Sequence, residues 1–129
     1  KKINKKDIRI GRSVINDLTN EDTGQGVVII NGKVIVIEES KGTDSMLLRA
    51  HRIIKENLVK NKREGILLKI PKLNQDMRTD LPTIGIKTLK NCVKIGLKGV
   101  VVQSGRSIFL DKSKCINLAN KKKMFICAI

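Results

Sequence analysis

The strongest constraint on the fold is the stretch VVIINGKVIVIEE, in which two β-branched, apolar runs flank Asn31 and Gly32. Asn followed by Gly is the favoured pair for a two-residue hairpin turn, because both residues of that turn have a positive φ. The sequence therefore predicts an antiparallel hairpin over residues 27–39. Both runs are apolar at nearly every position, so both strands are expected to be buried on both faces or nearly so.

Three other segments have the apolar spacing or the termini that are typical of helices. The first covers residues 7–19, and the second begins at Thr43 or Asp44, either of which is a suitable N-cap. The third is expected to be capped by Thr83 and to end near Gly96, because glycine accepts the left-handed conformation at a helix end.

Further strands are predicted for four apolar runs: GILLKIPK, GVVVQSG, SIFLD and MFICAI. The second and third of these runs are expected to meet at Ser104, Gly105 and Arg106. About six strands then alternate with about four helices, if a short helix over KSKCINLANKKK is included. This alternation predicts an α/β fold with a mixed, partly parallel sheet and helices packed on its faces.

The composition limits the possible functions of the chain but does not identify one. The chain has 129 residues, of which 40% are hydrophobic, enough for one domain with a core and too many for a disordered chain. The formal net charge of +15 favours an anionic partner such as a phosphate, a nucleotide, nucleic acid or a membrane surface. A Lys-rich composition can also produce this charge without a selected partner.

Several functional classes have little support in the sequence. Three cysteines without a C-x-x-C pair and a single histidine cannot build a zinc site, and two aromatic residues supply little base stacking. The glycine-rich phosphate motifs are absent, and no apolar run reaches the roughly 18 residues of a membrane span. His51 lies beside the apolar stripe of its helix, where a histidine is more often structural than a general base.

Polar side chains gather instead on three loops that follow predicted strands, where parallel sheets commonly bind ligands. Carboxylates that bind Mg²⁺, beside Lys and Arg that bind phosphate, suit the hydrolysis of a phosphoanhydride. Structural explanations also exist, since Asp44 can cap its helix, Asp80 can organise a turn, and Asp76 with Arg78 can form an exposed pair. In chain order the loops carry Glu38, Glu39, Thr43 and Asp44; Lys69, Lys72, Asn74, Gln75, Asp76, Arg78 and Asp80; and Ser104, Gly105 and Arg106.

The segments DTGQGVVIINGKVI, KGTDSMLLRA and GLKGVVVQSGRS, and above all LLKIPKLNQDMRTDLPTIGIKT, form a specific pattern. With this pattern the chain resembles the C-terminal domain of the LpxI-type UDP-2,3-diacylglucosamine pyrophosphatases, a family of lipid A biosynthesis. The resemblance implies hydrolysis of UDP-2,3-diacylglucosamine to 2,3-diacylglucosamine 1-phosphate (lipid X) and UMP, with Mg²⁺ or another divalent cation. It also implies that residues 1–129 are the catalytic and lipid-binding C-terminal domain of a two-domain enzyme, whose N-terminal domain is absent from this chain.

The resemblance also implies roles for individual residues. Lys41 stands where the family usually has Glu before Gly-Thr-Asp, so Glu38 or Glu39 would have to substitute if that Glu is catalytic. Which aspartate is indispensable, and which phosphorus is attacked, stays open. Carried over by position, the catalytic residues are Asp76, Asp80 and Asp44, the metal ligands are Asp76 and Asp80, and the substrate-binding residues are Lys69, Lys72, Gln75, Arg78, Thr43 and Arg106.

The partners implied are UDP-2,3-diacylglucosamine, lipid X and the N-terminal domain, with no nucleic acid. A cytoplasmic location is expected, with peripheral binding to the inner face of the cytoplasmic membrane. Two alternatives stay open. One is a non-catalytic basic module for nucleotides or RNA, and the other is a lipid-binding domain that is inactive without its N-terminal partner.

Overall fold

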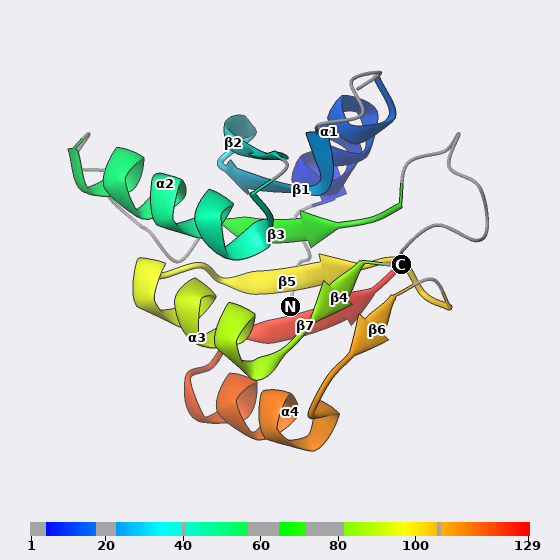
Figure 1. Cartoon of the computed structure of the whole chain (residues 1–129), viewed down its shortest axis with the longest axis vertical. Helices are drawn as coiled ribbons and strands as arrows, with labels where there is room; N and C mark the ends of the chain where they lie inside the picture. Colours follow the sequence, from blue (N-terminus) through cyan, green and yellow to red (C-terminus); the bar gives the residue numbers. More distant parts are fainter. Residues whose placement is uncertain (1–4, 18–22, 40, 57–64, 72–81, 106) are drawn as a thin grey trace.

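The computed structural model describes residues 5–17, 23–39, 41–56, 65–71, 82–105 and 107–129 (Figure 1). Strands and helices alternate along the second half of the chain, which confirms the predicted α/β class. In chain order the elements are α1 Lys5–Asp17, β1 Thr23–Ile30, β2 Lys33–Glu39, α2 Thr43–Glu56, β3 Ile66–Lys69, β4 Thr83–Ile84, α3 Ile86–Ile95, β5 Gly99–Val102, β6 Ile108–Phe109, α4 Lys112–Lys121 and β7 Phe125–Ala128.

Five of these strands form one mixed sheet in the order β2-β1-β3-β5-β7. β1 pairs antiparallel with both β2 and β3, whereas β3, β5 and β7 pair in parallel. β2 therefore runs in the same direction as β3, β5 and β7. The carboxyl ends of these four strands lie along one edge of the sheet, which we call the carboxyl edge.

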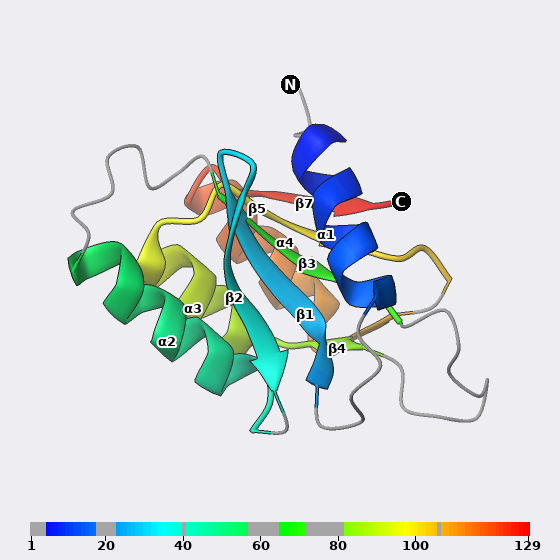
Figure 2. The ribbon, with the colours of Figure 1, turned by 90° about the horizontal axis from the view of Figure 1, so that it is seen from above.

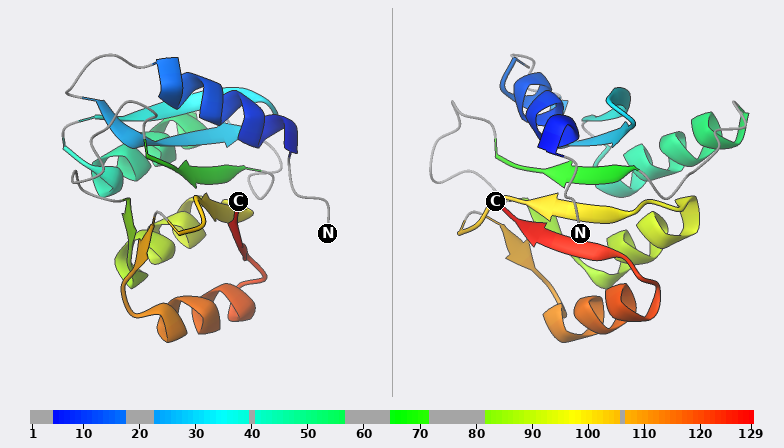
Figure 3. Two further views of the ribbon diagram at one scale, coloured as in Figure 1. Left: turned by 90° about the vertical axis from the view of Figure 1, so that its right-hand side faces the viewer. Right: turned by 180° about the vertical axis from the view of Figure 1, so that it is seen from behind.

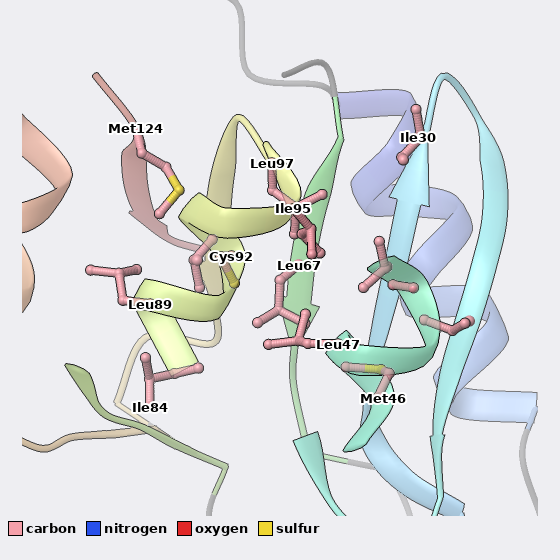
Figure 4. Packing of buried hydrophobic residues seen from close by; sticks show 14 of the residues in the cluster. Ile30, Met46, Leu47, Leu67, Ile84, Leu89, Cys92, Ile95, Leu97 and Met124 are labelled. Carbon is pink, nitrogen blue, oxygen red and sulfur yellow. The ribbon is translucent and has the colours of Figure 1, made fainter. Parts of the chain in front are cut away.

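Helices cover both faces of the sheet. α1 packs on one face against β1 and β3, and α2, α3 and α4 lie side by side on the other (Figure 2). The strands alternate accordingly: Val27 and Ile29 face α1, and Val28 faces α2. Figure 4 shows Leu47 of α2 and Leu89 of α3 in the larger of the two cores. No helix among the described residues has the length and apolar character needed to cross a membrane.

The structure confirms the predicted hairpin and corrects its burial. Asn31 and Gly32 have φ values of 50° and 78°, as the two-residue turn requires. β1 is buried from Gly26 onward, but β2 is an edge strand on which Val34 is 36% exposed. The expectation of two fully buried strands was wrong for β2, because apolar composition does not reveal which strand lies at the edge.

The region after Pro82 needs two further corrections. Thr83 belongs to the short strand β4 and caps no helix, since Gly85 occupies the N-cap position of α3. The predicted end of that helix at Gly96 is confirmed, with a left-handed φ of 82°. β6 pairs in parallel with β4 in a separate two-stranded sheet, whereas β5 pairs with β3 and β7. The strands over GVVVQSG and SIFLD were expected to meet, but β6 pairs with residues 25 positions upstream. Leu110 N–H, just after β6, donates to the Ile84 carbonyl at 2.8 Å.

Candidate functional site

A buried group of charged and polar side chains lies at the carboxyl edge. Lys69 is the last residue of β3, and its side chain is only 7% exposed. Its Nζ donates to Thr43 Oγ1 at 2.6 Å and lies 3.4 Å from Glu38 Oε1. Thr43 Oγ1 in turn donates to Glu38 Oε1 at 2.5 Å, so the three side chains form one closed network. We call Glu38, Thr43 and Lys69 the edge cluster.

Side-chain alternation and strand order explain how Glu38 and Lys69 meet. Glu38 and Lys69 lie on the same face of the sheet as Val36 and Leu67, so both side chains point toward α2. β1 lies between their strands, and Gly26 is the β1 residue between them. A Cβ at Gly26 would come within 2.8 Å of Glu38 Oε1, so glycine leaves the space in which Glu38 reaches Lys69.

The pairing explains how two charges can be buried here. An isolated buried charge is strongly unfavourable, and opposite charges in contact offset most of that cost when their hydrogen bonds are satisfied. The Thr43 hydroxyl accepts from Lys69 and donates to Glu38, which uses both capacities of the hydroxyl. The Gln25 backbone N–H also donates to Glu38 Oε2 at 3.4 Å. The edge cluster therefore holds the end of β3 in place by buried polar contacts, two residues before Pro71.

Asp44 points away from the edge cluster and toward α3. Its Oδ1 accepts from Asn91 Nδ2 at 3.1 Å and from Thr88 Oγ1 at 3.4 Å, and Lys87 Nζ lies 3.9 Å from its Oδ2. α2 begins after Gly42, whose carbonyl accepts from Met46 N–H, so neither Thr43 nor Asp44 occupies the N-cap position. These contacts of Asp44 join α2 to α3, and its catalytic role stays a prediction.

Asp44 also affects a neighbouring thiol. Burial, and secondarily the negative charge of Asp44, raises the pKa of Cys92 well above its ordinary range. Burial and then the charge of Asp111 likewise raise the pKa of Cys115. Both thiols therefore stay protonated near neutral pH, which fits the role of small buried hydrophobes.

One cavity adjoins the carboxyl edge, and another lies between two of the helices. One of about 370 Å³ lies at the ends of β5 and β7, where Ser104 and Gly105 border the apolar side chains of Phe109 and Ile126. The other, of about 230 Å³, lies between α2 and α3 and is lined in part by His51 and Asp44. The third predicted loop thus borders an apolar cavity.

The structure brings together part of the predicted site. Glu38, Thr43 and Lys69, taken from two of the predicted loops, are in direct contact, whereas Glu39 pairs with Arg49 at 3.5 Å. Within the described ranges, no group of three or more His, Cys, Asp or Glu side chains could hold a metal ion. The predicted site residues that lie outside the described residues, and stay predictions, are Lys72, Asn74, Gln75, Asp76, Arg78, Asp80 and Arg106.

Sequence reasoning missed Gly26. A signal was present, since Gly26 directly precedes the apolar run in GQGVVII and Glu38 directly follows the facing apolar run in VIVIEE. Without the strand order, nothing indicated that these two departures from the apolar pattern are opposite each other.

Comparison with known proteins agrees with the pattern of the sequence. Residues 1–127 match the family model of the LpxI C-terminal domain. The chain is 34% identical over 124 residues to the UDP-2,3-diacylglucosamine pyrophosphatase LpxI of Caulobacter vibrioides. This alignment covers 95% of the chain and 44% of the relative, so the chain spans less than half the length of that protein. The chain therefore belongs to the family of LpxI C-terminal domains.

Proposed function

We propose that this chain is the catalytic part of a UDP-2,3-diacylglucosamine pyrophosphatase, which forms lipid X and UMP in lipid A biosynthesis. The observation that carries the proposal is 34% identity, along 95% of the chain, to a protein of that name. The geometry supports it, because the loops after β2, β3 and β5 all leave the carboxyl edge, where ligands of parallel sheets bind. The N-terminal half of such a protein is the proposed partner.

The reaction requires a water molecule to attack one phosphorus of the diphosphate. A bond forms between the water oxygen and that phosphorus, the bond from phosphorus to the bridging oxygen breaks, and the water proton passes to a carboxylate. We assign this carboxylate to Asp76 or Asp80. Arg78 and Lys72 would neutralise charge on the phosphate oxygens, and Arg106 and Gln75 would bind the remaining polar groups of the substrate.

The edge cluster has a defined place in this proposal. Lys69 is already paired with Glu38, so its charge is largely neutralised within the protein. Thr43 and Lys69 would hold the chain in position just before the segment that carries the proposed catalytic aspartates. Direct binding of the substrate by Lys69 and Thr43 is also part of the proposal, and it would require the Thr43 hydroxyl to turn its one proton from Glu38 to the substrate.

A divalent cation, Mg²⁺ in the first instance, belongs to the proposal. Asp76 and Asp80 supply the carboxylate oxygens that Mg²⁺ prefers, and the described residues supply no cluster of their own. When bound, the cation would lower the negative charge on the diphosphate. Treatment with EDTA is expected to abolish UMP release, and added Mg²⁺ is expected to restore it.

The decisive test measures UMP release from UDP-2,3-diacylglucosamine by the full-length protein and its variants. Asp76→Asn and Asp80→Asn are each expected to lower the rate at least a hundredfold, since a positioned proton acceptor contributes about 10²–10⁴. Asp17→Asn, on the exposed end of α1, is the matched control and should leave the rate unchanged. Full activity in both site variants, with thermal unfolding unchanged, would refute the assignment of the site.

A further inference from the structure

The net positive charge is high in residues 82–129 because this part of the chain has few acidic residues. Residues 82–129 contain ten Lys and Arg residues and a single acidic residue, Asp111. Neither α3 nor α4 contains an Asp or Glu, so their lysines have no acidic neighbour on their own helix. The basic residues are Lys87, Lys90, Lys94, Lys98, Arg106, Lys112, Lys114, Lys121, Lys122 and Lys123.

Exposed aliphatic side chains lie among these lysines where β6 leads into α4. Ile108, Leu110 and Ile116 are 43%, 54% and 43% exposed, within nine residues of sequence. Lys112 and Lys114 lie between them on the first turn of α4 and are also exposed. We call these five residues the basic apolar corner.

The corner lies beside the carboxyl edge. Leu110 N–H donates to the carbonyl of Ile84, and a Cβ at Gly85 would lie 3.8 Å from the Leu110 Cβ, so the corner adjoins the start of α3. Lys87, two residues farther along, is 81% exposed, and its Nζ lies 3.9 Å from Asp44 Oδ2. In Figure 3, β6 leads from the end of the sheet to α4 with β4 paired beside it, far from the hairpin turn between β1 and β2.

We propose that the basic apolar corner docks the protein on an anionic lipid bilayer, with the aliphatic side chains inserted between headgroups and the lysines against the lipid phosphates. Aliphatic side chains of this size gain about 1.5–3 kcal/mol on full removal from water. Leaving three of them exposed in one corner is typical of a surface that contacts a partner. Lys112 and Lys114 outnumber Asp111, the exposed acidic residue beside them, so the charge of the corner favours an anionic partner.

The aliphatic residues favour a membrane over nucleic acid. Single-stranded nucleic acid is bound by basic grooves with aromatic side chains that stack on bases. The corner contains Ile and Leu instead of aromatic residues. Aliphatic side chains neither stack on bases nor bind phosphate groups. An acyl–headgroup boundary, in contrast, accepts both the aliphatic and the cationic groups.

This docking rests on the proposed function, because an enzyme that acts on a membrane lipid has to bring its carboxyl edge close to the bilayer. Binding to vesicles without substrate needs no hydrolysis. Failure of the docking would leave the enzymatic assignment intact, and failure of UMP release would leave the docking intact.

The test is co-sedimentation of the purified full-length protein with vesicles of equal parts phosphatidylglycerol and phosphatidylcholine, and with vesicles of phosphatidylcholine alone. Binding is expected only to the anionic vesicles, and it should fall steeply toward 1 M NaCl, where the Debye length is about 3 Å. Lys112→Gln with Lys114→Gln should weaken binding by about 25-fold, because each lysine near an anionic surface contributes about a factor of five. Leu110→Ser should weaken binding by about fivefold, with Ile116→Ser as a second variant.

The chain offers matched controls. Val34→Ser changes an exposed aliphatic residue of β2, and Lys33→Gln with Lys55→Gln removes the same charge from exposed positions outside the corner. Each control should change binding less than twofold. Equal losses in the corner and control variants would overturn the proposal, and so would equal binding to both vesicle types. Binding of poly(U) that depends on Lys112 and Lys114, with vesicle binding unaffected by Leu110→Ser, would assign the lysines to nucleic acid and overturn it as well.

Discussion

Replacing Glu38 with Gln tests whether the edge cluster is a buried ion pair on which the fold depends. Gln keeps the shape of Glu38 and can still accept from Thr43, but it leaves the positive charge of Lys69 buried without its partner. At the observed 3.4 Å, opposite unit charges attract by about 5 kcal/mol at an effective dielectric constant of about 20. Breaking a buried pair by removing one partner commonly costs about 3–5 kcal/mol, so we expect a loss in this range.

The loss is measured by denaturant and thermal unfolding. For 129 residues an unfolding entropy of about 2.1 cal/mol/K per residue converts 3–5 kcal/mol into a decrease in Tm of roughly 11–18 °C. Glu39→Gln is the matched control: the same substitution one residue away breaks the pair with Arg49, but the Glu39 side chain is 63% exposed. An exposed pair contributes about 0–1 kcal/mol. If Glu38→Gln costs no more than Glu39→Gln, the description of the edge cluster is wrong.

The double variant Glu38→Gln with Lys69→Met separates structure from function. It removes both charges, so it should recover most of the stability that either single variant loses, with a coupling energy of about 2 kcal/mol or more. If Lys69 also binds substrate, UMP release stays low in this stable double variant. Full activity in it would limit Lys69 to a structural role.

Three further outcomes are expected from the packing and the thiols. Gly26→Ala should lower the free energy of unfolding by about 1–3 kcal/mol in denaturant, because the new Cβ would lie 2.8 Å from Glu38 Oε1. The control Gly85→Ala, whose Cβ would make only ordinary contacts, should cost less than about 1 kcal/mol. Equal losses in the two variants would contradict the role of Gly26. Titration of the native protein with a thiol reagent at pH 8 should modify Cys127 rapidly and the other two cysteines only after unfolding, because Cys92 and Cys115 are buried; rapid modification of all three would refute this burial. Burial raises the pKa of Cys92 in the folded state, whereas an exposed thiol ionises near pH 9.0, so the unfolded state releases the proton first. The free energy of unfolding should therefore fall as pH rises above 9, by roughly 1.4 kcal/mol at pH 10 from this thiol, and Cys92→Ala should remove that part of the pH dependence.

Local sequence determined the elements that depend on short-range geometry. Asn31 and Gly32 specified the hairpin because Asn-Gly tolerates the two positive φ values that the turn requires. Gly96 specified the end of α3 because glycine accepts the left-handed conformation there. The family was also readable from the sequence, because its long motif around Lys69 is contiguous. Thr83 was misassigned, since a two-residue strand has no periodicity of its own.

Only the tertiary structure decided which residues meet. Apolar runs predict strands but not their order, so β2 at the edge and the pairing of β4 with β6 could not be foreseen. Glu38 and Lys69 lie 31 residues apart and on separate strands, and they form a pair because β1 runs between them with Gly26 at the crossing point. The energy of that contact depends on burial and distance, and both are properties of the packed sheet and helix α2 rather than of any segment alone.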